Sequence, residues 1–416
     1  MLFRSDKPAG ESLPRFQKIL DEAKQKKLMV QMGYMYRYNP AVVLLRQFLA
    51  QGWLGDVFEV HAVMSKVVDP PARRALAEYK GGKMTIWSSI QAPSSCGSYV
   101  AGILRMPISD VRVIVPTLGG GYGGKIDPMC EPLAAILARR TGRAVRVSLT
   151  RSEEFVTAGK HPSRITLRSG VKRDGTLVAH SAQVYYDGGS YSLNTPEKIF
   201  RGYASTGPYR VPNVHVDSYG VYTNTLPASA FRGYGIPQVA WAHEQQMDQI
   251  AEALGMDPLA LRLKNVFRPG DAFSTGEILA EDLHYTELLE DAASHIGWAW
   301  PPARERSGSR VRGKGLAAII KGTASYGANA VVKLNADGSL NVLTSTVEMG
   351  QGALTVLAQI AAHEATLPLG VVRVSTPDTA NTPFDQMTAA SRSTNFMGRA
   401  IRRAVKSVKQ QLIELA

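Results

Sequence analysis

The residues with the clearest chemical potential form the run GGGYGGK, Gly119 to Lys125, between an expected strand and an expected helix. Its five glycines permit backbone conformations closed to other residues, so successive N–H groups can point into one concavity and bind phosphate or oxo groups. The run also satisfies the patterns GxGxxG and GxxxxGK. However, Ile126 stands where a magnesium-binding loop needs Ser or Thr, and no acidic residue closes the next strand in the dinucleotide-binding manner. The run therefore predicts either an anion site or a structural tight turn.

A second glycine-flanked motif is AFRGYGIPQ, residues 230–238. Arg232 lies between small residues and can offer a bidentate fork to an oxyanion, while the ring of Tyr234 offers a flat face. The structural alternative is that Arg232 serves only as an ion-pair partner. Both interpretations remain open from the residues alone.

Two further loops carry small or polar residues. EMGQG, residues 348–352, precedes the apolar segment ALTVLAQIAAHEA and puts Gln351 at a helix start. The amide of Gln351 and free backbone N–H groups could bind an anion there, or the Gln could simply form the turn. TAASRST, residues 388–394, could let the backbone approach a large ligand, or could be a linker.

Other site chemistry has little support in the residues. The eight His include no i, i+4 pair and no HExxH motif, and GxSxG is absent, which disfavours zinc hydrolases and serine hydrolases with that motif. Cys96 and Cys130 are the only cysteines, too few to hold a four-cysteine zinc or iron–sulfur centre. We expect no metal ligand from the protein side chains.

Composition and charge limit the class of protein. A chain of 416 residues is long enough for two or three domains. The net charge of +13 is spread along the chain without the aromatic interleaving of nucleic-acid-binding proteins, so no nucleic-acid partner is expected. The N-terminus has no apolar signal core, and no run is long enough to cross a membrane. We expect a cytoplasmic protein with no membrane partner.

The elements expected to position these motifs are short strands, glycine turns and longer helices. Strands are predicted at 84–89 and 111–116, and helices at 131–140 and 353–365. Two hairpins are predicted to turn at Asp174-Gly175 and Asp337-Gly338. The shared turn chemistry suggests two related subdomains, and the polar residues 301–313 are expected to be a linker.

WSSIQAP (87–93), GGGYGGK, AFRGYGIPQ, EMGQG and TAASRST occur in this order over about residues 83–416. Together they resemble the molybdenum-binding subunit of the xanthine dehydrogenase/aldehyde oxidase family. The resemblance implies an α+β molybdopterin-binding fold, with a first subdomain at 83–300 and the start of a second at 301–416.

The resemblance also implies roles for individual residues. Gln91 matches the glutamine that lies over the metal, and Arg232 matches the arginine beside cofactor and substrate; we expect both to be catalytic. Tyr234 is expected in the substrate pocket. The residues expected to bind the cofactor are Gln91, Gly121, Tyr122, Gly123, Arg232, Gln351, Ala390 and Ser391.

The implied chemistry is the oxidation of an aldehyde or N-heterocycle by a molybdenum–molybdopterin cofactor in its dinucleotide form. Two electrons would then leave through iron–sulfur and FAD groups on partner subunits. Ile126 stands where some purine-oxidising members carry a substrate-orienting Glu, and no Cys marks the carbon monoxide dehydrogenase branch. The family's GxGE glutamate, its general base, does not occur before Ala416, so we expect weak activity or none from this chain alone.

The first 82 residues resemble a different family, the Gfo/Idh/MocA oxidoreductases, through DKPAG (6–10), MGYMYRYNPAV (32–42) and GWLGDVFEVHA (52–62). Lys7, Arg37 and Asn39 match motif residues of these NAD(P)-dependent enzymes. We expect an N-terminal α/β fragment at 1–82, either naturally fused or an assembly artefact. Two alternative functions stay open: an NAD(P)-dependent sugar dehydrogenase of this type, and an inert assembly subunit that presents the basic C-terminal helix.

Overall fold

The computed structural model describes residue 25 and residues 73–415, except for residues 117, 192, 281, 302–304, 308 and 324–326. The motif residues Lys7, Arg37 and Asn39 lie outside the described residues. The chain divides into two compact units. The first unit contains the described parts of Met1–Gly159 and Ala324–Ala416, and the second unit is Lys160–Thr323.

The first sheet of the first unit has the strand order β3-β2-β1-β4. Its strands are β1 (Arg74–Lys80), β2 (Lys83–Ser88), β3 (Val111–Ile114) and β4 (Val145–Ser148). Gly81 and Gly82 join β1 to β2 with φ of 58° and 79°, the left-handed conformation that a two-residue hairpin requires. The boundary expected at residue 82 therefore falls inside a hairpin, and residues 74–80 belong to the first unit's sheet.

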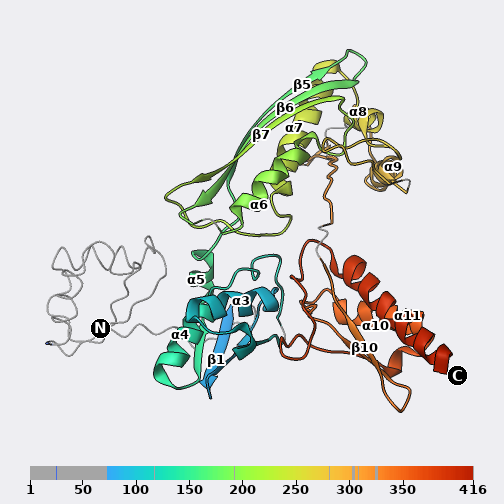
Figure 1. Cartoon of the computed structure of the whole chain (residues 1–416). Coiled ribbons are helices and arrows are strands. Elements are labelled where there is room, and N and C mark those ends of the chain that lie inside the picture. Colours follow the sequence, from blue (N-terminus) through green and yellow to red (C-terminus); the bar gives the residue numbers. More distant parts are fainter. Residues whose placement is uncertain are drawn as a thin grey trace. The chain divides into compact units, whose positions relative to one another are not determined.

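Two helices cover one face of this sheet, α3 (Pro93–Leu104) and α4 (Glu131–Thr141) (Figure 1). The predicted helix at 131–140 and its end at Gly142, which has φ of 64°, are confirmed. Buried apolar residues of both helices and the sheet form a continuous core, and Val347 from the later part of the chain completes it. The short elements here are η1 (Ile108–Asp110) and α5 (Arg151–Phe155).

The later part of the first unit is a sheet of order β10-β11-β12 packed against two helices (Figure 1). Its elements are β10 (Val331–Leu334), β11 (Leu340–Leu343), α10 (Ala353–Ala365), η3 (Leu369–Val371), β12 (Val372–Val374), the π-helical turn η4 (Ser393–Met397) and α11 (Gly398–Leu415). The loop after β12 pairs with β3, since Val115 N donates to Pro377 O at 3.0 Å and Thr379 N to Val113 O at 3.0 Å. Arg112 and Asp378 add an ion pair there, so the two parts are joined into one unit.

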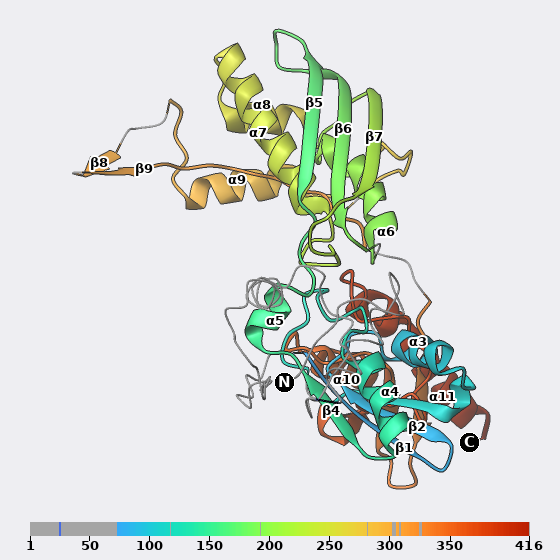
Figure 2. The ribbon, with the colours of Figure 1, turned by 90° about the vertical axis from the view of Figure 1, so that its left-hand side faces the viewer.

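The second unit is built on a long sheet of order β5-β6-β7 with α7 lying along one face (Figure 2). Its strands are β5 (Ser163–Val171), β6 (Leu177–Gly189), β7 (Asn213–Tyr222) and the short pair β8 (Glu305–Ser307) and β9 (Arg310–Arg312). Its helices are α6 (Thr195–Ile199), η2 (Phe200–Thr206), α7 (Ile236–Leu254), α8 (Pro258–Asn265) and α9 (Tyr285–His295). The expected linker at 301–313 thus contains a small hairpin, β8–β9.

One connectivity recurs in all three larger sheets. An antiparallel hairpin is followed by a helical connection and then by a strand parallel to the second hairpin strand. Both hairpins predicted from the sequence are present, with Gly175 and Gly338 at φ of 86° and 80° in their turns. The strands β1 to β3 repeat the pattern a third time, which the sequence analysis did not anticipate.

The second unit extends to Thr323, and Ala318 and Ile320 pack into its two cores. The subdomains expected at 83–300 and 301–416 stay a prediction. Among the described helices none is long and apolar enough to pass through a membrane.

Candidate functional site

Gln91 is placed by the strand before it and the helix after it. It follows β2, whose last residue, Ser88, donates a hydrogen bond to the carboxylate of Glu131 at the start of α4. Pro93 then begins α3. Since both flanking elements are packed into the first unit's core, the position of Gln91 is fixed and its side chain is 1% exposed.

The Gln91 side chain joins two loops that are far apart in sequence. Its Oε1 accepts hydrogen bonds from Gly123 N at 3.0 Å and Lys125 N at 3.3 Å. Its Nε2 donates to Thr388 O at 2.8 Å, and the Thr388 backbone N–H donates back to Gln91 O at 2.9 Å. The second Nε2 hydrogen has no acceptor among the described residues, so one buried amide donor remains available to a ligand.

The glycine run forms a tight loop against this amide. Gly119, Gly120 and Gly123 have φ of 68°, 97° and 87°. At Gly121 a Cβ would lie 2.6 Å from Gln91 Cδ and Oε1 and from Met349 Sδ, so only glycine permits this approach. Within the described chain, the N–H groups of Gly119, Gly120 and Gly121 have no acceptor. Three successive unpaired donors are the arrangement that binds an anion.

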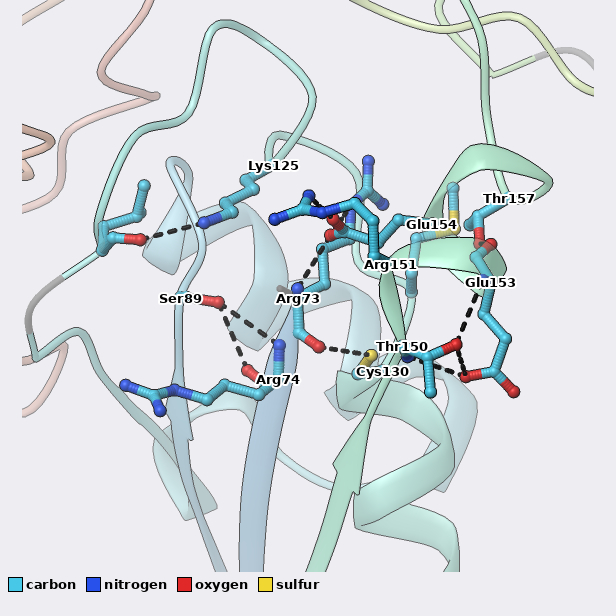
Figure 3. A network of polar contacts seen from close by, with 12 residues as sticks. Arg73, Arg74, Ser89, Lys125, Cys130, Thr150, Arg151, Glu153, Glu154 and Thr157 are labelled. Atoms are coloured by element: carbon cyan, nitrogen blue, oxygen red, sulfur yellow. Dashed lines mark hydrogen bonds and ion pairs between the residues drawn. The ribbon is translucent and has the colours of Figure 1, made fainter. Parts of the chain in front are cut away.

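Lys125 closes the base of the loop rather than pointing into it. Its Nζ donates to Leu118 O at 2.9 Å, and the residue is 7% exposed (Figure 3). Burial lowers the pKa of Lys125, while Glu154 partly opposes this effect. The phosphate-binding lysine that a GxxxxGK loop would require is therefore engaged in holding the loop.

The neighbouring polar network anchors the start of β1 to α5 (Figure 3). Arg73 N donates to Glu154 Oε1 at 2.8 Å, and Arg151 Nη1 donates to Glu154 Oε2 at 2.7 Å. Thr150 and Glu153 form a capping box at the start of α5, which satisfies two free N–H groups of the helix. These contacts hold the end of the sheet beside the glycine loop.

The loop of residues 345–352 does not offer the free N–H groups that were expected to bind an anion before α10. The N–H groups expected to be free at the start of α10 are occupied, because Glu348 Oε1 accepts from Gly350 N at 2.7 Å and Gly352 N at 3.0 Å, and Oε2 accepts from Leu354 N at 3.2 Å. Gln351 Oε1 accepts from Met349 N at 2.6 Å and its Nε2 donates to Val347 O at 3.0 Å. The structure thus gives Gln351 the role of a turn former, and its contact with a cofactor stays a prediction.

The loop of residues 385–392 is held by two polar anchors. Thr388 Oγ1 accepts from Val347 N at 2.7 Å, which joins this loop to the one before α10. Arg392, 1% exposed, pairs with Asp385 and donates to Met387 O at 2.8 Å and Gly327 O at 2.7 Å. Four segments, 88–91, 118–125, 345–352 and 385–392, therefore converge in the first unit; we call them the four-loop site.

Left-handed backbone conformations concentrate at the predicted site residues. Six described residues other than glycine have positive φ. Arg105 and Thr366 are ordinary C-caps of α3 and α10. The other four are Tyr122, Tyr234, Ala390 and Ser391, with φ between 52° and 59°. Strained residues of this kind collect at ligand-binding sites, so the four support the assignment of their loops to function.

Arg232 and Tyr234 belong to the second unit, whereas the other candidates belong to the first. Tyr234 lies in the loop that leads to α7, between Gly233 and Gly235, whose φ values are 96° and 89°. Its hydroxyl donates to Glu197 Oε2 at 2.6 Å, and Lys198 Nζ lies 4.7 Å from its ring centroid. The exposed Arg232 accepts a hydrogen bond at its backbone oxygen from Lys160 Nζ at 3.1 Å.

Two alternative functions find no support in the described residues. A dinucleotide loop opens a helix directly, but here Ile126–Cys130 separate the glycine run from α4, and the carboxylate of Glu131 occupies the first turn. On α11, Arg402 Nε bonds Glu364 Oε2 of α10 at 2.9 Å, and Lys406 lies 3.8 Å from the same carboxylate. Both cations contact Glu364 within the chain, while their side chains stay exposed.

The four-loop site suits a large, oxygen-rich ligand without protein metal ligands. Among the described residues there is no group of three or more His, Cys, Asp or Glu that could hold a metal ion. The available donors are instead backbone N–H groups and one buried amide, and the walls are side-chain-free glycine. Such a donor set fits a metal that brings its own organic ligand and phosphate or oxo groups.

Comparison with protein families also indicates a metal that is bound through an organic ligand. The family model described as a molybdopterin cofactor-binding domain matches residues 58–266, and a second model of the same description matches residues 291–416. The chain belongs to this family, and its cofactor is molybdenum bound by molybdopterin. The α+β fold predicted from the motifs is confirmed.

Known relatives extend the match. The chain is 37% identical to the xanthine dehydrogenase molybdenum-binding subunit of Escherichia coli O157:H7 over 349 residues, 80% of this chain and 46% of that protein. It is 36% identical to the nicotinate dehydrogenase large molybdopterin subunit of Eubacterium barkeri over 239 residues, 57% of this chain and 56% of that protein. The chain spans about half the length of the relatives it matches.

Solved structures are similar as well. The aldehyde oxidoreductase of Desulfovibrio desulfuricans superposes with a TM-score of 0.75 and 28% identity, covering 81% of this chain and 38% of that one. Quinoline 2-oxidoreductase from Pseudomonas putida 86 gives a TM-score of 0.72 at 25% identity, over 82% of this chain and 47% of that one. The likeness covers most of this chain and less than half of each neighbour.

Sequence reasoning missed two residues that organise the four-loop site. Thr388 joins three of the four segments, although the sequence showed only a Thr among small residues. Glu348 fills the start of α10, and its position four residues before Gly352 was the available signal. Both act through backbone groups, which a search for catalytic side chains does not detect.

Proposed function

We propose that this chain is the molybdenum-cofactor-binding part of a hydroxylase or dehydrogenase that oxidises an aldehyde or an N-heterocycle. The observation that carries the proposal is the row of N–H groups at Gly119, Gly120 and Gly121, which have no acceptor in the part of the chain that the structure describes, beside the buried amide of Gln91. When bound, the molybdopterin cofactor supplies two-electron redox chemistry.

The protein's contribution is to bind and orient. The glycine run offers three N–H donors to oxygen atoms of the cofactor, and the remaining N–H of Gln91 offers a fourth from a buried position. Preorganised donors of this kind stabilise developing negative charge without needing to reorganise. Tyr122, 64% exposed at φ of 53°, stands in the middle of the run. The contacts of Ala390 and Ser391 with the cofactor, and the dinucleotide form of its tail, belong to the same proposal.

The decisive experiment measures cofactor content rather than turnover. The full chain is produced in cells that make the cofactor, and molybdenum is quantified by mass spectrometry together with the fluorescence of oxidised pterin. We expect both signals in wild type and a decrease of at least about tenfold in Gln91→Ala, which removes the buried amide and its loop contacts.

The matched control is Gln410→Ala on the exposed face of α11, where the Gln side chain donates a hydrogen bond to Glu414 of the same helix. Cofactor content of this variant should equal that of wild type. Absence of molybdenum and pterin from every preparation, including those with partner subunits supplied, would contradict the proposal.

The assembly forms a separate part of the proposal. We expect the electrons to leave through iron–sulfur and FAD groups on partner subunits, because Cys96 and Cys130 are both buried and cannot ligate a four-cysteine cluster. Co-purification with subunits that carry these groups tests this expectation. The substrate class and the catalytic roles of Gln91 and Arg232 depend on the assembled enzyme.

The Gfo/Idh/MocA resemblance of the first 82 residues also remains a prediction. If that segment contributes nucleotide binding, titration of the chain with NADH should give a saturable fluorescence change that Lys7→Ala weakens. A fluorescence change that rises linearly with NADH in the wild type would contradict nucleotide binding by this segment. It would not affect the molybdenum proposal.

A further inference from the structure

Lys125 is a buried cation held by one backbone oxygen. Its Nζ donates to Leu118 O at 2.9 Å, and the residue is 7% exposed. An ammonium group carries three donor hydrogens, and the described residues supply an acceptor for one of them. Figure 3 shows this ammonium pointing away from Glu154, the carboxylate whose charge acts on it. Since buried charges normally have a charged partner, the contact with Leu118 needs a physical reason.

The surroundings of Lys125 favour an additional anion. Burial lowers the pKa of Lys125, while the charge of Glu154 opposes this effect. Three guanidinium groups lower the pKa further, those of Arg73, Arg74 and Arg151. Glu154 already accepts Arg73 N at 2.8 Å and Arg151 Nη1 at 2.7 Å. A bound anion near Lys125 would therefore stabilise the charged form of the lysine.

The contact with Leu118 O reaches the glycine run through a single peptide bond. The C=O of Leu118 and the N–H of Gly119 belong to one planar peptide unit. A cation at the carbonyl oxygen polarises this unit, which makes the N–H at its other end a stronger donor. Because the bond is trans, this N–H points away from Lys125. Gly119 is exposed, and its N–H has no acceptor in the described chain, so a ligand can reach the polarised donor.

Lys125 also contacts the second donor of the four-loop site. Its backbone N–H donates to Gln91 Oε1 at 3.3 Å, and its C=O accepts from Gln91 N at 2.8 Å. A hydrogen bond to Oε1 polarises the amide and strengthens the Nε2–H groups as donors. One residue thus acts on both the Gly119 N–H and the Gln91 amide without occupying the place of a ligand.

We propose that Lys125 is a positioning residue for the anionic cofactor, and that its charge acts on cofactor oxygen atoms through the Leu118–Gly119 peptide rather than by direct contact. The inference rests on the proposed function for the identity of the ligand, whereas the polarised peptide rests on the contact between Lys125 and Leu118. The competing explanation is a hydrogen bond that only closes the loop. The two explanations differ in whether the charge of Lys125 matters.

The first experiment measures the polarisation of the peptide bond by NMR on the full chain without cofactor. Leucine labelled with carbon-13 at the carbonyl and glycine labelled with nitrogen-15 select the Leu-Gly bonds at 54–55, 118–119, 254–255 and 369–370. Carbon detection avoids the exchange of exposed N–H groups with water at high pH. We expect the 118–119 signal to shift with pH, with a midpoint below the ordinary pKa of lysine. The signals of 254–255 and 369–370 serve as internal controls, and Lys125→Met should abolish the response of 118–119.

The second experiment measures the molybdenum and pterin content of variants produced in cells that make the cofactor. Lys125→Met keeps an apolar side chain but removes the charge, and we expect a decrease of about tenfold. Lys125→Arg keeps a cation that can donate to Leu118 O and should retain at least about half of the wild-type content. The matched control is Lys314→Met, which removes an exposed lysine whose Nζ donates to Gly297 O at 2.7 Å. Its cofactor content should equal that of wild type.

Cofactor binding and the titration of Lys125 should be linked. An anionic ligand favours the ammonium form, so loading the cofactor should raise the pH at which the 118–119 signal shifts. A hydrogen bond that only closes the loop predicts the same midpoint with and without cofactor. The wild-type titration needs no variant, so it decides between the two explanations even if Lys125→Met does not fold.

The outcomes separate this inference from the proposed function. A 118–119 signal that does not follow the titration of Lys125, or equal losses of pterin in Lys125→Met and Lys125→Arg, would overturn the inference. A wild type without molybdenum and pterin, whose 118–119 signal still follows Lys125, would refute the proposed function only. A molybdenum-containing wild type whose content is matched by Lys125→Met would refute the role of Lys125 only.

Discussion

Single side chains, or their absence, decide whether the four loops can meet. Gln91 accepts hydrogen bonds from two N–H groups of the glycine run and donates one to Thr388 O. One side-chain amide therefore holds together loops that are not joined by regular secondary structure. The Gln91 side chain can reach these loops only because Gly121 has no Cβ in its path. The chemistry of the site therefore depends on a position without a side chain as much as on one with an amide.

Gly121→Ala should reduce cofactor binding. The new Cβ would lie 2.6 Å from Gln91 and Met349 atoms, so Gln91 must shift and lose its bonds to Gly123 and Lys125. Two lost hydrogen bonds of about 1 kcal/mol each correspond to a loss of roughly tenfold or more in affinity, read out as pterin content. Gly102→Ala, in open space on α3, should have no effect. Full pterin content in Gly121→Ala would show that the contact is dispensable.

Arg392→Met should destabilise the first unit strongly. The change leaves Asp385, 1% exposed, without its charge partner and removes the bonds to Met387 O and Gly327 O. Breaking a buried pair costs about 3–5 kcal/mol, which thermal unfolding detects as a large fall in midpoint. Arg402→Met removes an exposed partner of Glu364 and should leave the midpoint close to that of wild type. Similar midpoints for the two variants would argue against the ion pair as an anchor.

At the scale of elements, the start of α10 shows how a loop and a helix share donors. Glu348 takes three N–H groups that would otherwise need water or a ligand. The helix therefore stabilises its own preceding loop. This loop in turn supplies Val347 N to Thr388, which ties α10 to the four-loop site.

Glu348→Gln should loosen the start of α10 in a pH-dependent way. Burial alone would raise the pKa of Glu348, but the N–H groups of Leu354, Gly350 and Gly352 outweigh it, so the pKa lies below its ordinary value. A carboxylate with a lowered folded pKa stabilises the fold above its unfolded pKa of about 4.3 and loses this contribution as pH falls through the folded value. At pH 7 we expect the substitution to lower the local stability of the start of α10 by about 1 kcal/mol. Faster amide hydrogen exchange at residues 350–354 would measure this loss.

As the pH falls through the folded pKa of Glu348, the wild type should approach the variant, since protonation removes the same charge. Glu290→Gln on the exposed face of α9 serves as the control and should leave exchange at residues 350–354 unchanged. A difference between wild type and Glu348→Gln that is independent of pH would exclude the carboxylate charge as its cause.

At the scale of the whole molecule, the chain leaves the first unit at Gly159 and returns to it at Ala324. The first unit is therefore built from two distant stretches, while the second is continuous. Val347 in the core of the early stretch shows that the first unit needs both stretches to complete its packing.

The second unit should fold when produced alone as residues 160–323. Among the described residues, its two cores draw on residues within this range alone. We expect cooperative thermal unfolding by circular dichroism. A fragment of residues 160–300, ending at the boundary expected from sequence, lacks Ala318 and Ile320 and should melt at a lower temperature. Equal melting of both fragments would place the boundary before residue 301.

Local chemistry explains what could be predicted from the sequence. The turns at Asp174-Gly175 and Asp337-Gly338, the helix ending at Gly142 and the glycine run between β3 and α4 all depend on residues adjacent in the chain. The family resemblance predicted Gln91, Gly121 and Tyr122 as members of one site by the same local motifs. The boundaries expected at 82 and 300 remain predictions. The contacts around them include the pairing of β1 with β4 and the packing of Ala318 and Ile320, which join stretches distant in the sequence.

The sequence by itself determined which segments must be side-chain-free, since glycine alone adopts these conformations without strain. It did not determine which of these segments meet. The bond between Gln91 and Thr388 spans 297 positions, and Glu348 rather than a ligand satisfies the start of α10. Such contacts depend on the packing of whole sheets and helices, which only the tertiary structure fixes, because hydrogen bonding between loops has no periodic pattern in the sequence.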